Sequence, residues 1–386
     1  MEEKITIKEN EIKLADVHRI FSKWLFINDP LIIDLLLATY LSNQKEGTPV
    51  WLFIVAQSGD MKSELMRPFF RLHNVIVIDN MTTNSLISGH EEAQDLFSQI
   101  IGRNIMLIIP DVAVLSSKSP NEKNEIWAQF RNLYDGLLSK RTGMISKYST
   151  DLHVTLIGGA TPNFRSQYII NNQLGSRELL YTPNDRSEYL QKKLDKAMEN
   201  DNYEQEMRKE LMGAVMDFLC NKKLRTIDIG INNNRELNEF LNQQVKKLSI
   251  LRATAHIDYY SSSIIGEINK ETPTRAKKQL KRIIEALLSL DKNYDISNVK
   301  KIIERIVQSS GNQLRMQIMN EYEKGGKGIY RISELSEITR ANKKMVRIEL
   351  NYLWQLGWLE KKVTTEDVCG RMKSVPHYIR INEGKK

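Results

Sequence analysis

The stretch WLFIVAQSGDMKSELM, which spans Trp51–Met66, decides the fold of the first half of the chain. Its first five residues are apolar, a polar turn follows, and Lys62 and Ser63 come directly after the turn. Strand, loop and helix in this order are the layout of the phosphate-binding pattern G-x-x-x-x-G-K-[ST]. Ala56 and Met61 stand where that pattern has its two glycines. The stretch therefore predicts a phosphate-binding loop that is altered at both glycine positions.

Further apolar runs predict a sheet around this loop. They are continuous rather than alternating, which is typical of parallel strands that are buried on both faces. Stretches with helical periodicity lie between them, such as 63–72 and 124–138. Alternation of strands with helices predicts an α/β sandwich. The predicted strands are 50–56, 75–79, 105–111 and 153–161.

Helical periodicity of apolar residues predicts that the rest of the chain is mostly helical. Two helices are predicted in 15–43, and the pattern from about 185 to 310 is almost wholly helical, with His256 as a packed helical residue. The last segment predicts three short helices and a β-hairpin, which is the order of a winged helix-turn-helix. The predicted domains are a short helical lead-in (1–45), an α/β core (46–186), a helical lid (187–310) and a winged helix (311–386).

Composition excludes several classes of protein. With 386 residues, 41% of them hydrophobic and 27% charged, the chain is typical of a soluble globular protein of two or three domains. No apolar run approaches the roughly 20 residues that cross a bilayer, and MEEKITIKEN at the N-terminus lacks the apolar core of a signal peptide. Cys220 and Cys369 are far apart and indicate a reducing compartment, so we expect a cytoplasmic protein with no membrane partner.

Positive charge is concentrated at the C-terminal end. The formal net charge is +8, and residues 311–386 contribute 15 Lys and Arg against 9 Asp and Glu, or +6. A basic terminal quarter predicts a module that binds a polyanion such as DNA, with a solvated basic tail as the alternative. Lys343, Lys344 and Arg347 begin the third predicted helix of this module, where groove contacts usually arise. We expect salt-sensitive binding with little sequence preference, or else a protein contact by the same surface.

The altered loop predicts a nucleotide site with several further groups. Backbone amides of the loop would surround the phosphates, Lys62 would contact the β- and γ-phosphates, and Ser63 would ligate Mg²⁺. Asp111 ends the predicted strand 105–111, where a carboxylate can hold the water shell of Mg²⁺. The alternative for Asp111 is a helix N-cap. The loop residues are Gln57, Ser58, Gly59, Asp60 and Met61.

Three more residues follow in an order that suits the same site. Thr161 ends the last predicted strand, a suitable place to position an attacking water. Arg177, in LGSRELLY, is suited to reach the nucleotide of a neighbouring subunit, where an arginine stabilises the charge of the transition state. Arg275 lies in the first turn of the predicted helix that begins at ETPTRAKKQL, from which it would touch the phosphates.

Taken in this order, the segments resemble the AAA+ ATPase module of the self-loading, minichromosome-maintenance-like replicative helicases of phages and staphylococcal-type mobile elements. The resemblance covers nearly the whole chain, and it is most specific where these helicases carry a hairpin before the sensor-1 strand. It implies an α/β fold: an AAA+ P-loop ATPase core with a helical lid, followed by a C-terminal winged helix-turn-helix. The matching segments are GTPVWLFIVAQSGDMKSEL, MTTNSLISG, IMLIIPDVAVLSS, FRNLYDGLLSKRTG, GGATPNF, LGSRELLY, LRATAHIDYY and ETPTRAKKQL.

The resemblance also implies an activity and residue roles. It implies a homo-oligomeric ring, a hexamer, that uses ATP and Mg²⁺ to draw single-stranded DNA through its pore, with duplex DNA at the winged helix and other replication proteins as partners. The hairpin residues that would contact DNA phosphates are Lys140, Arg141 and Lys147. The implied roles at the nucleotide are Walker A for Lys62 and Ser63, Walker B for Asp111, sensor 1 for Thr161, arginine finger for Arg177 and sensor 2 for Arg275.

Some residues depart from the family pattern and bear on turnover. Met61 replaces the glycine that lets the backbone approach phosphates closely, and Asp60 sets a carboxylate beside a triphosphate. Val112 follows Asp111, so the Asp-Glu pair that often supplies a general base is missing. The alternative function is therefore a DNA-binding protein with weak or absent hydrolysis, which would act as a replication initiator, loader or regulator.

Overall fold

The structure of the protein is a computed structural model that divides into two compact units. The first unit comprises Met1–Leu241 with Arg275–Ile306, and the second comprises Asn242–Thr274 with Val307–Lys386. Asp60, one of the predicted loop residues, lies outside the described residues. The structure describes residues 12–59, 61–88, 95–116, 118–141, 146–163, 175, 177–184, 187–225, 235–258, 260–261, 263–324, 328–367 and 372–381.

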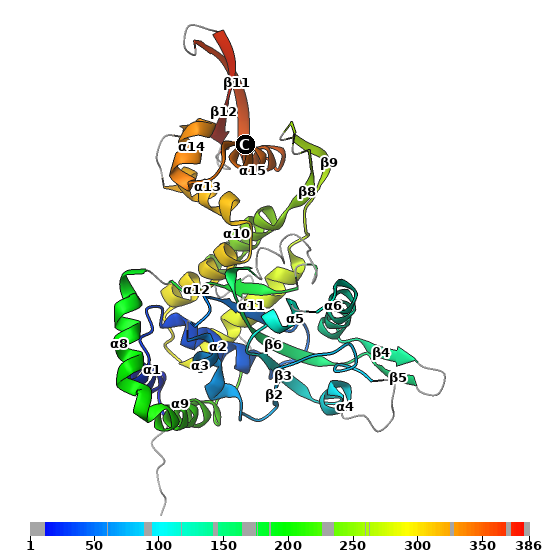
Figure 1. Ribbon diagram of the computed structural model, residues 1–386, viewed down its shortest axis with the longest axis vertical. Helices are drawn as coiled ribbons and strands as arrows, with labels where there is room; N and C mark the ends of the chain where they lie inside the picture. The colour runs from blue at the N-terminus through cyan, green and yellow to red at the C-terminus, as the bar shows by residue number, and fades with distance from the viewer. Residues whose placement is uncertain are drawn as a thin grey trace, which may run out of the picture. The chain divides into compact units, whose positions relative to one another are not determined.

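A five-stranded sheet forms the centre of the first unit (Figure 1). Its strand order is β2-β3-β6-β1-β7, and each neighbouring pair is parallel. The middle strands β1, β3 and β6 are almost entirely buried, as continuous apolar runs predict. The predicted α/β class and its parallel sheet are therefore confirmed. The strands are β1 (Trp51–Val55), β2 (Val75–Val77), β3 (Asn104–Ile109), β6 (His153–Ala160) and β7 (Leu179–Tyr181).

The strand order brings three loops to one edge of the sheet. From β1 the chain crosses to the outer strand β2 and returns through β3 to β6, which lies between β3 and β1. Leu156 of β6 pairs with Leu107 on one side and with Trp51 on the other. Because the strands are parallel, the residues that follow β1, β3 and β6 lie at the same edge, where open α/β sheets bind ligands.

Two glycines let the ends of these strands approach closely. A Cβ atom on Gly159 would lie 2.0 Å from the carbonyl oxygen of Pro110, and one on Gly158 would lie 2.5 Å from the ring of Phe53. The amide of Val112 donates to the carbonyl of Gly159 at 2.8 Å. A larger residue at either glycine would push apart the segments that carry the predicted site residues.

Helices pack around this sheet. In α1, Val17, Phe21 and Trp24 are buried at helical spacing, whereas α2 is buried on nearly every side. These two helices occupy the segment 15–43, where two helices were expected. Although α2 is apolar, no helix among the described residues is long and apolar enough to cross a membrane. The helices are α1 (Leu14–Trp24), α2 (Leu31–Ser42), α3 (Lys62–Met66), α4 (Leu96–Ile100), α5 (Ala113–Ser116), α6 (Pro120–Tyr134), α8 (Leu190–Asn200), α9 (Glu204–Leu219) and α11 (Thr274–Leu290).

A two-stranded hairpin extends from the first unit, away from the five-stranded sheet (Figure 1). It consists of β4 (Leu138–Arg141) and β5 (Ser146–Ser149), which are antiparallel. Lys140 pairs with Lys147 in the ladder, so their side chains share one face of the hairpin. The neighbouring pairs, which include Arg141 and Tyr148, share the opposite face.

The second unit contains three short helices and a three-stranded sheet of order β10-β12-β11. The order of helices and hairpin along the chain is the predicted one. Arg315 of α13 is 1% exposed and donates to Glu349 of α15 at 2.7 Å, so a buried ion pair joins two of the helices. The elements are α13 (Gln313–Glu323), β10 (Ile329–Tyr330), α14 (Ile332–Thr339), α15 (Lys343–Gln355), β11 (Leu359–Asp367) and β12 (Met372–Arg380).

One segment of the expected helical region is a β-hairpin instead. After α10 (Arg235–Arg252) the chain forms the antiparallel strands β8 (Thr254–Asp258) and β9 (Ser263–Asn269) before α11 begins. His256 lies exposed on β8, so the expectation that it is a packed helical residue was wrong. β-branched residues occur on both sides of a polar turn here, a composition that favours a hairpin over a helix. The helix α12 (Ile296–Ser309) completes the elements.

Candidate functional site

The loop after β1 holds Lys62 in a defined position. Lys62 is 9% exposed at the start of α3, and its ammonium donates to the carbonyl of Ala56 at 2.7 Å and to that of Gln57. Gly59 has a positive φ of 80°, which only glycine adopts without strain. Gln57 and Ser58 before it are exposed, Met61 is half-buried, and Ser63 is exposed. The lysine of the predicted pattern is thus buried beneath an exposed loop.

A cavity of about 420 Å³ borders this loop. Gln57, Ser58, Gly59 and Met61 form one wall of it. The end of α1 and the residues after it form a second wall, and one face of α8 with the start of α9 forms the third. Glu64 of α3 also lines the cavity. The residues of the second and third walls are Trp24, Leu25, Phe26, Leu190, Lys193, Leu194, Lys196, Ala197, Asn200, Glu204 and Met207.

Apolar side chains and charged groups of both signs line the cavity. Leu190 and Leu194 of α8 are 59% and 51% exposed and lie on the cavity wall. Phe26 packs against Tyr189 with ring centres 5.7 Å apart. Ligand sites are mostly apolar with a few polar groups, and here the charged groups of the lining are Lys193, Lys196, Glu64 and Glu204.

Asp111 and Thr161 follow the adjacent strands β3 and β6 at the same edge of the sheet. The carboxylate of Asp111 accepts from the amide of Ala113 at 2.9 Å, so it interacts with the first residue of α5. Asp111 is nevertheless exposed. Among the described residues, no group of three or more His, Cys, Asp or Glu side chains is arranged to hold a metal ion. A serine and one carboxylate suit Mg²⁺, which retains several waters and binds through phosphates.

Glu64 is bound by arginines. Its Oε1 accepts from Arg67 Nε at 3.2 Å and from Arg208 Nη2 at 3.0 Å, and its Oε2 accepts from Arg208 Nε at 3.2 Å. These bonds fix α9 to the start of α3, beside the cavity. Both oxygens of Glu64 accept from arginine. Glu64 would have to lose some of these bonds to act as the general base of hydrolysis.

Arg177 and Arg275 lie beside the same tyrosine. Their guanidinium carbons are 5.7 and 5.8 Å from the ring centre of Tyr134, which is within cation–π range. Arg177 also pairs with Asp135, with Nη2 and Oδ2 2.5 Å apart, and Arg275 donates to the carbonyl of Gly175 at 3.1 Å. Burial raises the pKa of Tyr134, so its phenol stays neutral. The structure therefore brings the two predicted arginines together at Tyr134, and these contacts hold them to α6 and to the segment before β7 rather than to the loop.

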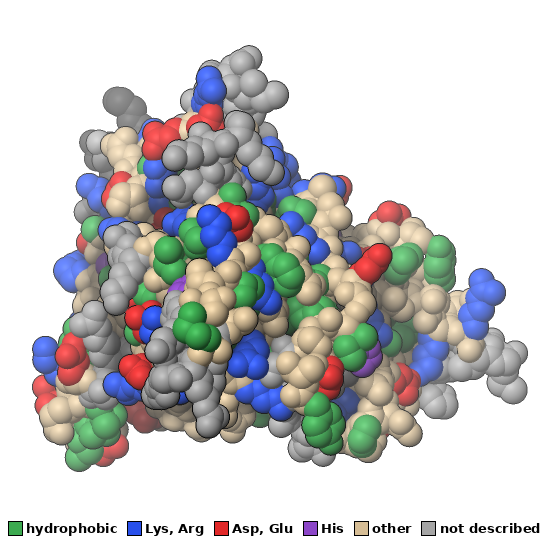
Figure 2. Space-filling model, turned by 90° about the horizontal axis from the view of Figure 1, so that it is seen from above, with side chains coloured by type: hydrophobic (Ala, Val, Ile, Leu, Met, Phe, Trp, Pro, Cys, Tyr) green, Lys and Arg blue, Asp and Glu red, His purple; other side chains and the backbone are tan. Residues whose placement is uncertain are grey.

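The residues on the outer face of the β4–β5 hairpin are not all the ones that positive charge in the sequence predicts. Lys147 donates to Asp95 at 2.8 Å, and Lys140 donates to Asn84 Oδ1 at 2.6 Å, so both lysines are bound on the inner face. Arg141 and Tyr148 lie on the outer face, where Tyr148 is 61% exposed. Figure 2 shows basic side chains at its right-hand end, where the hairpin extends.

In the second unit, the predicted DNA-contacting residues lie on one stretch of α15. Lys343, Lys344 and Arg347 are exposed near its first turn, which Asn342 caps by accepting from the amide of Lys344 at 2.8 Å. Trp354, further along the helix, is 40% exposed, and its ring centre is 4.8 Å from the ammonium of Lys361. This surface combines cations with an aromatic ring.

Two residues that the structure places around the site, Tyr134 and Gln279, are not identifiable from the sequence. Tyr134 lies in a predicted helix and reads as core, and the fully buried Gln279 in α11 had no motif to mark it. Gln279 shares its helix face with Arg275 and Arg282, so polarity alone does not single it out. No protein-family model matches the chain, and a comparison with curated proteins gives no significant match.

Proposed function

We propose that this protein is an AAA+-type P-loop ATPase that binds DNA and acts as a helicase or translocase in the replication of a mobile element or phage. The observation that carries the proposal is the buried Lys62 under a loop that borders the 420 Å³ cavity. A nucleotide joins a flat apolar base to an anionic tail; the cavity supplies apolar side chains, and the buried Lys62 lies beneath the loop that forms one of its walls.

The edge of the sheet supports this proposal. β6 lies between β1 and β3, so Thr161 follows the strand next to the one that precedes the loop, and Asp111 follows the strand beyond it. Three segments that are far apart in the sequence thus meet where an open α/β sheet binds its ligand. In the proposed function Lys62 exchanges the carbonyls of the loop for phosphate oxygens, and Thr161 orients the attacking water.

The residues that would hold Mg²⁺ are Ser63 and Asp111. Bound there, Mg²⁺ would neutralise charge on the phosphates. Asp111 is exposed at the end of β3, and its bond to the backbone of α5 uses one oxygen. The other oxygen keeps acceptor capacity for a water of the ion, because a carboxylate has about four lone-pair sites.

Arg177 and Arg275 would act from the opposite side of a shared site. They lie together at Tyr134, and a hexameric ring would present both to the nucleotide of the neighbouring subunit. DNA is the proposed partner of the hairpin and of the second unit, which we infer to be a winged helix. Other replication proteins complete the proposed partners.

A specific observation favours the second candidate function, in which the protein binds DNA but hydrolyses ATP weakly or not at all. Glu64 accepts from two arginines, and Asp111 accepts from the backbone of α5. Glu64 and Asp111 thus each have a hydrogen-bond partner in the structure. An initiator, loader or regulator needs the nucleotide for assembly and has no need of a general base.

Turnover with and without single-stranded DNA separates the two functions. The proposed ATPase hydrolyses ATP, and Lys62→Ala abolishes hydrolysis because the phosphates lose their buried cation. Lys300→Ala removes an ion-paired lysine outside the site and should leave turnover unchanged. Nucleotide binding without turnover, even with DNA, supports the second function. Neither binding nor turnover, with the fold intact by circular dichroism, overturns both.

A further inference from the structure

Three residues of α11 form a row that binds backbone carbonyls of the first unit. Arg275, Gln279 and Arg282 are spaced by four and three positions, so they lie on one face of the helix. Each donates to a carbonyl that is far away in the sequence: Arg275 to Gly175, Gln279 to Arg177 and Arg282 to both Lys45 and Glu46. The row fixes α11 to the segments that precede β1 and β7.

Gln279 is the central member of the row. Its side chain is fully buried, and its Nε2 donates to the carbonyl of Arg177 at 2.7 Å and to that of Pro49 at 3.4 Å. Its Oε1 is buried and has no hydrogen-bond partner among the described residues. A buried amide with an unpaired oxygen costs stability, and an apolar side chain would avoid that cost. The bond to Arg177 gives a reason for a glutamine at this place.

The bond matters because of what lies on either side of it. One turn before Gln279 on α11, Arg275 contacts the ring of Tyr134, and the same ring contacts the guanidinium of Arg177. Asp135, next to Tyr134, binds the Nε and Nη2 edge of Arg177. Both side chains are thus fixed at Tyr134, while Gln279 fixes the backbone of Arg177 to the helix that carries Arg275.

We propose that Gln279 is a positioning residue that holds Arg177 and Arg275 as one preassembled pair for the phosphate of a nucleotide. This inference rests on the proposed function, in which both arginines stabilise charge that develops during phosphoryl transfer. Two cations set in advance act without reorganisation at the moment of reaction. When the bond from Gln279 is lost, the backbone of Arg177 is free to shift relative to α11, and the pair loses its geometry.

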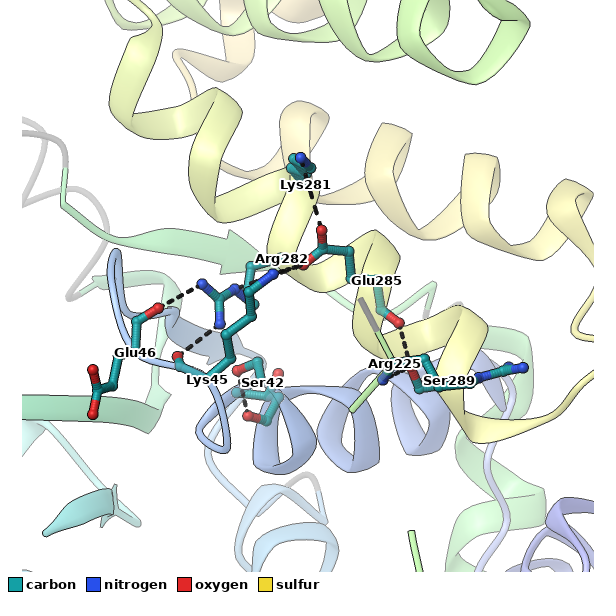
Figure 3. A network of polar contacts seen from close by, with 9 residues as sticks. Ser42, Lys45, Glu46, Arg225, Lys281, Arg282, Glu285 and Ser289 are labelled. Atoms are coloured by element: carbon teal, nitrogen blue, oxygen red, sulfur yellow. Dashed lines mark hydrogen bonds and ion pairs between the residues drawn. The ribbon is translucent and has the colours of Figure 1, made fainter. Parts of the chain in front are cut away.

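Arg282 provides a matched control on the same helix face. It is 9% exposed and its two carbonyl acceptors lie before β1, next to the ion pairs of Glu285 with Lys45 and Lys281 (Figure 3). Arg282→Lys keeps the charge and weakens this end of the row, seven residues from Arg275. It should lower stability to an extent similar to Gln279→Met without disturbing the arginine pair.

The decisive measurement is steady-state turnover of full-length protein for the wild type, Gln279→Met and Arg282→Lys. Gln279→Met should lower kcat at least tenfold and leave KM within about twofold, because misplacing a group by about 1 Å can cost up to a hundredfold in rate. KM should hold because the loop, Lys62 and the cavity are unchanged. Arg282→Lys should keep kcat within about twofold. Equal kcat for the two variants overturns the proposal.

A second measurement does not depend on turnover. Hydrogen exchange of the peptide that contains 177–181 should accelerate in Gln279→Met and stay at the wild-type rate in Arg282→Lys. Unchanged exchange in Gln279→Met shows that the bond holds nothing, which also overturns the proposal. A wild type without any turnover contradicts the ATPase; in that case nucleotide-dependent assembly, measured by analytical ultracentrifugation, should weaken in Gln279→Met and not in Arg282→Lys. Equal assembly of the two variants overturns the positioning role on its own.

Discussion

Lys147 donates a hydrogen bond of 2.8 Å to Asp95, and the side chains of the two residues are 13% and 1% exposed. Asp95 also accepts from the amides of Ser88 and Ser98. One carboxylate thus joins β5 of the hairpin to the start of α4. The pair fixes the inner face of the hairpin to the body of the first unit, so Lys147 has a structural role.

Breaking this pair should destabilise the first unit. Lys147→Met leaves Asp95 as a buried charge without its cation, and removing one partner of a buried pair costs about 3 kcal/mol. The free energy of unfolding from urea denaturation, followed by circular dichroism, measures the loss. Arg141→Met, one residue from the ladder partner of Lys147 but on the outer face, should change stability by less than about 0.5 kcal/mol. Equal stability of the two variants would contradict a structural role for Lys147.

The outer face of the hairpin should contact single-stranded DNA through Tyr148 and Arg141. An exposed aromatic ring beside a cation is a common way to bind a single strand, and loss of the ring costs about 1–3 kcal/mol per stacked base. Tyr148→Ala should therefore weaken binding of a labelled oligonucleotide by about tenfold, whereas Tyr148→Phe keeps the ring and should bind like the wild type. Fluorescence anisotropy measures the binding. All variants also carry Lys343→Ala and Arg347→Ala, which weaken the predicted DNA contacts of α15, so that the signal reports on the hairpin. Wild-type affinity in Tyr148→Ala would rule the contact out.

Stability should fall as the pH drops through the titration range of His153. Burial, followed by the nearby Arg282 charge, lowers the pKa of His153 below its ordinary value of 6.5. The unfolded chain then binds the proton more readily than the folded one, so stability is greatest above about pH 6.5 and declines below it. His153→Phe removes the titrating group and should flatten this part of the profile. Urea midpoints between pH 7.5 and 5 measure it, and identical slopes for both proteins would refute the assignment.

The sequence predicts the sheet well because its signal is local. Parallel strands buried on both faces require continuous apolar runs, and β1, β3 and β6 have them. The hairpin β8–β9 escaped prediction because it is short and follows a long helix whose periodicity dominates the window. Strand pairing depends on a partner segment that no local pattern reveals.

For the candidate site, the sequence predicts the types of the residues and their order along the chain, but not which of them contact one another. Charge marks Lys140, Arg141 and Lys147 alike, yet alternation along the hairpin separates Arg141 from the other two. Asp95, which binds Lys147, lies 52 positions away in the sequence. The same holds for Gln279 and Arg177, which are 102 positions apart. Contacts of this kind arise from packing, and they decide which of several candidate side chains can reach a ligand.

A mixing experiment tests whether the nucleotide site is shared between subunits. Lys62→Ala lacks the phosphate-binding lysine but keeps Arg177, whereas Arg177→Ala keeps the loop and lacks the arginine. Each variant alone should show almost no turnover, because each ring would lack one half of every site. In an equimolar mixture, about a quarter of the interfaces combine an intact loop with an intact neighbouring arginine, so up to about a quarter of wild-type activity should return. Lys62→Ala mixed with Lys62→Ala/Arg177→Ala provides the control, since no interface in that mixture is complete. A mixture as inactive as this control, with both variants folded and assembled, would place the arginine and the loop of a site in the same chain.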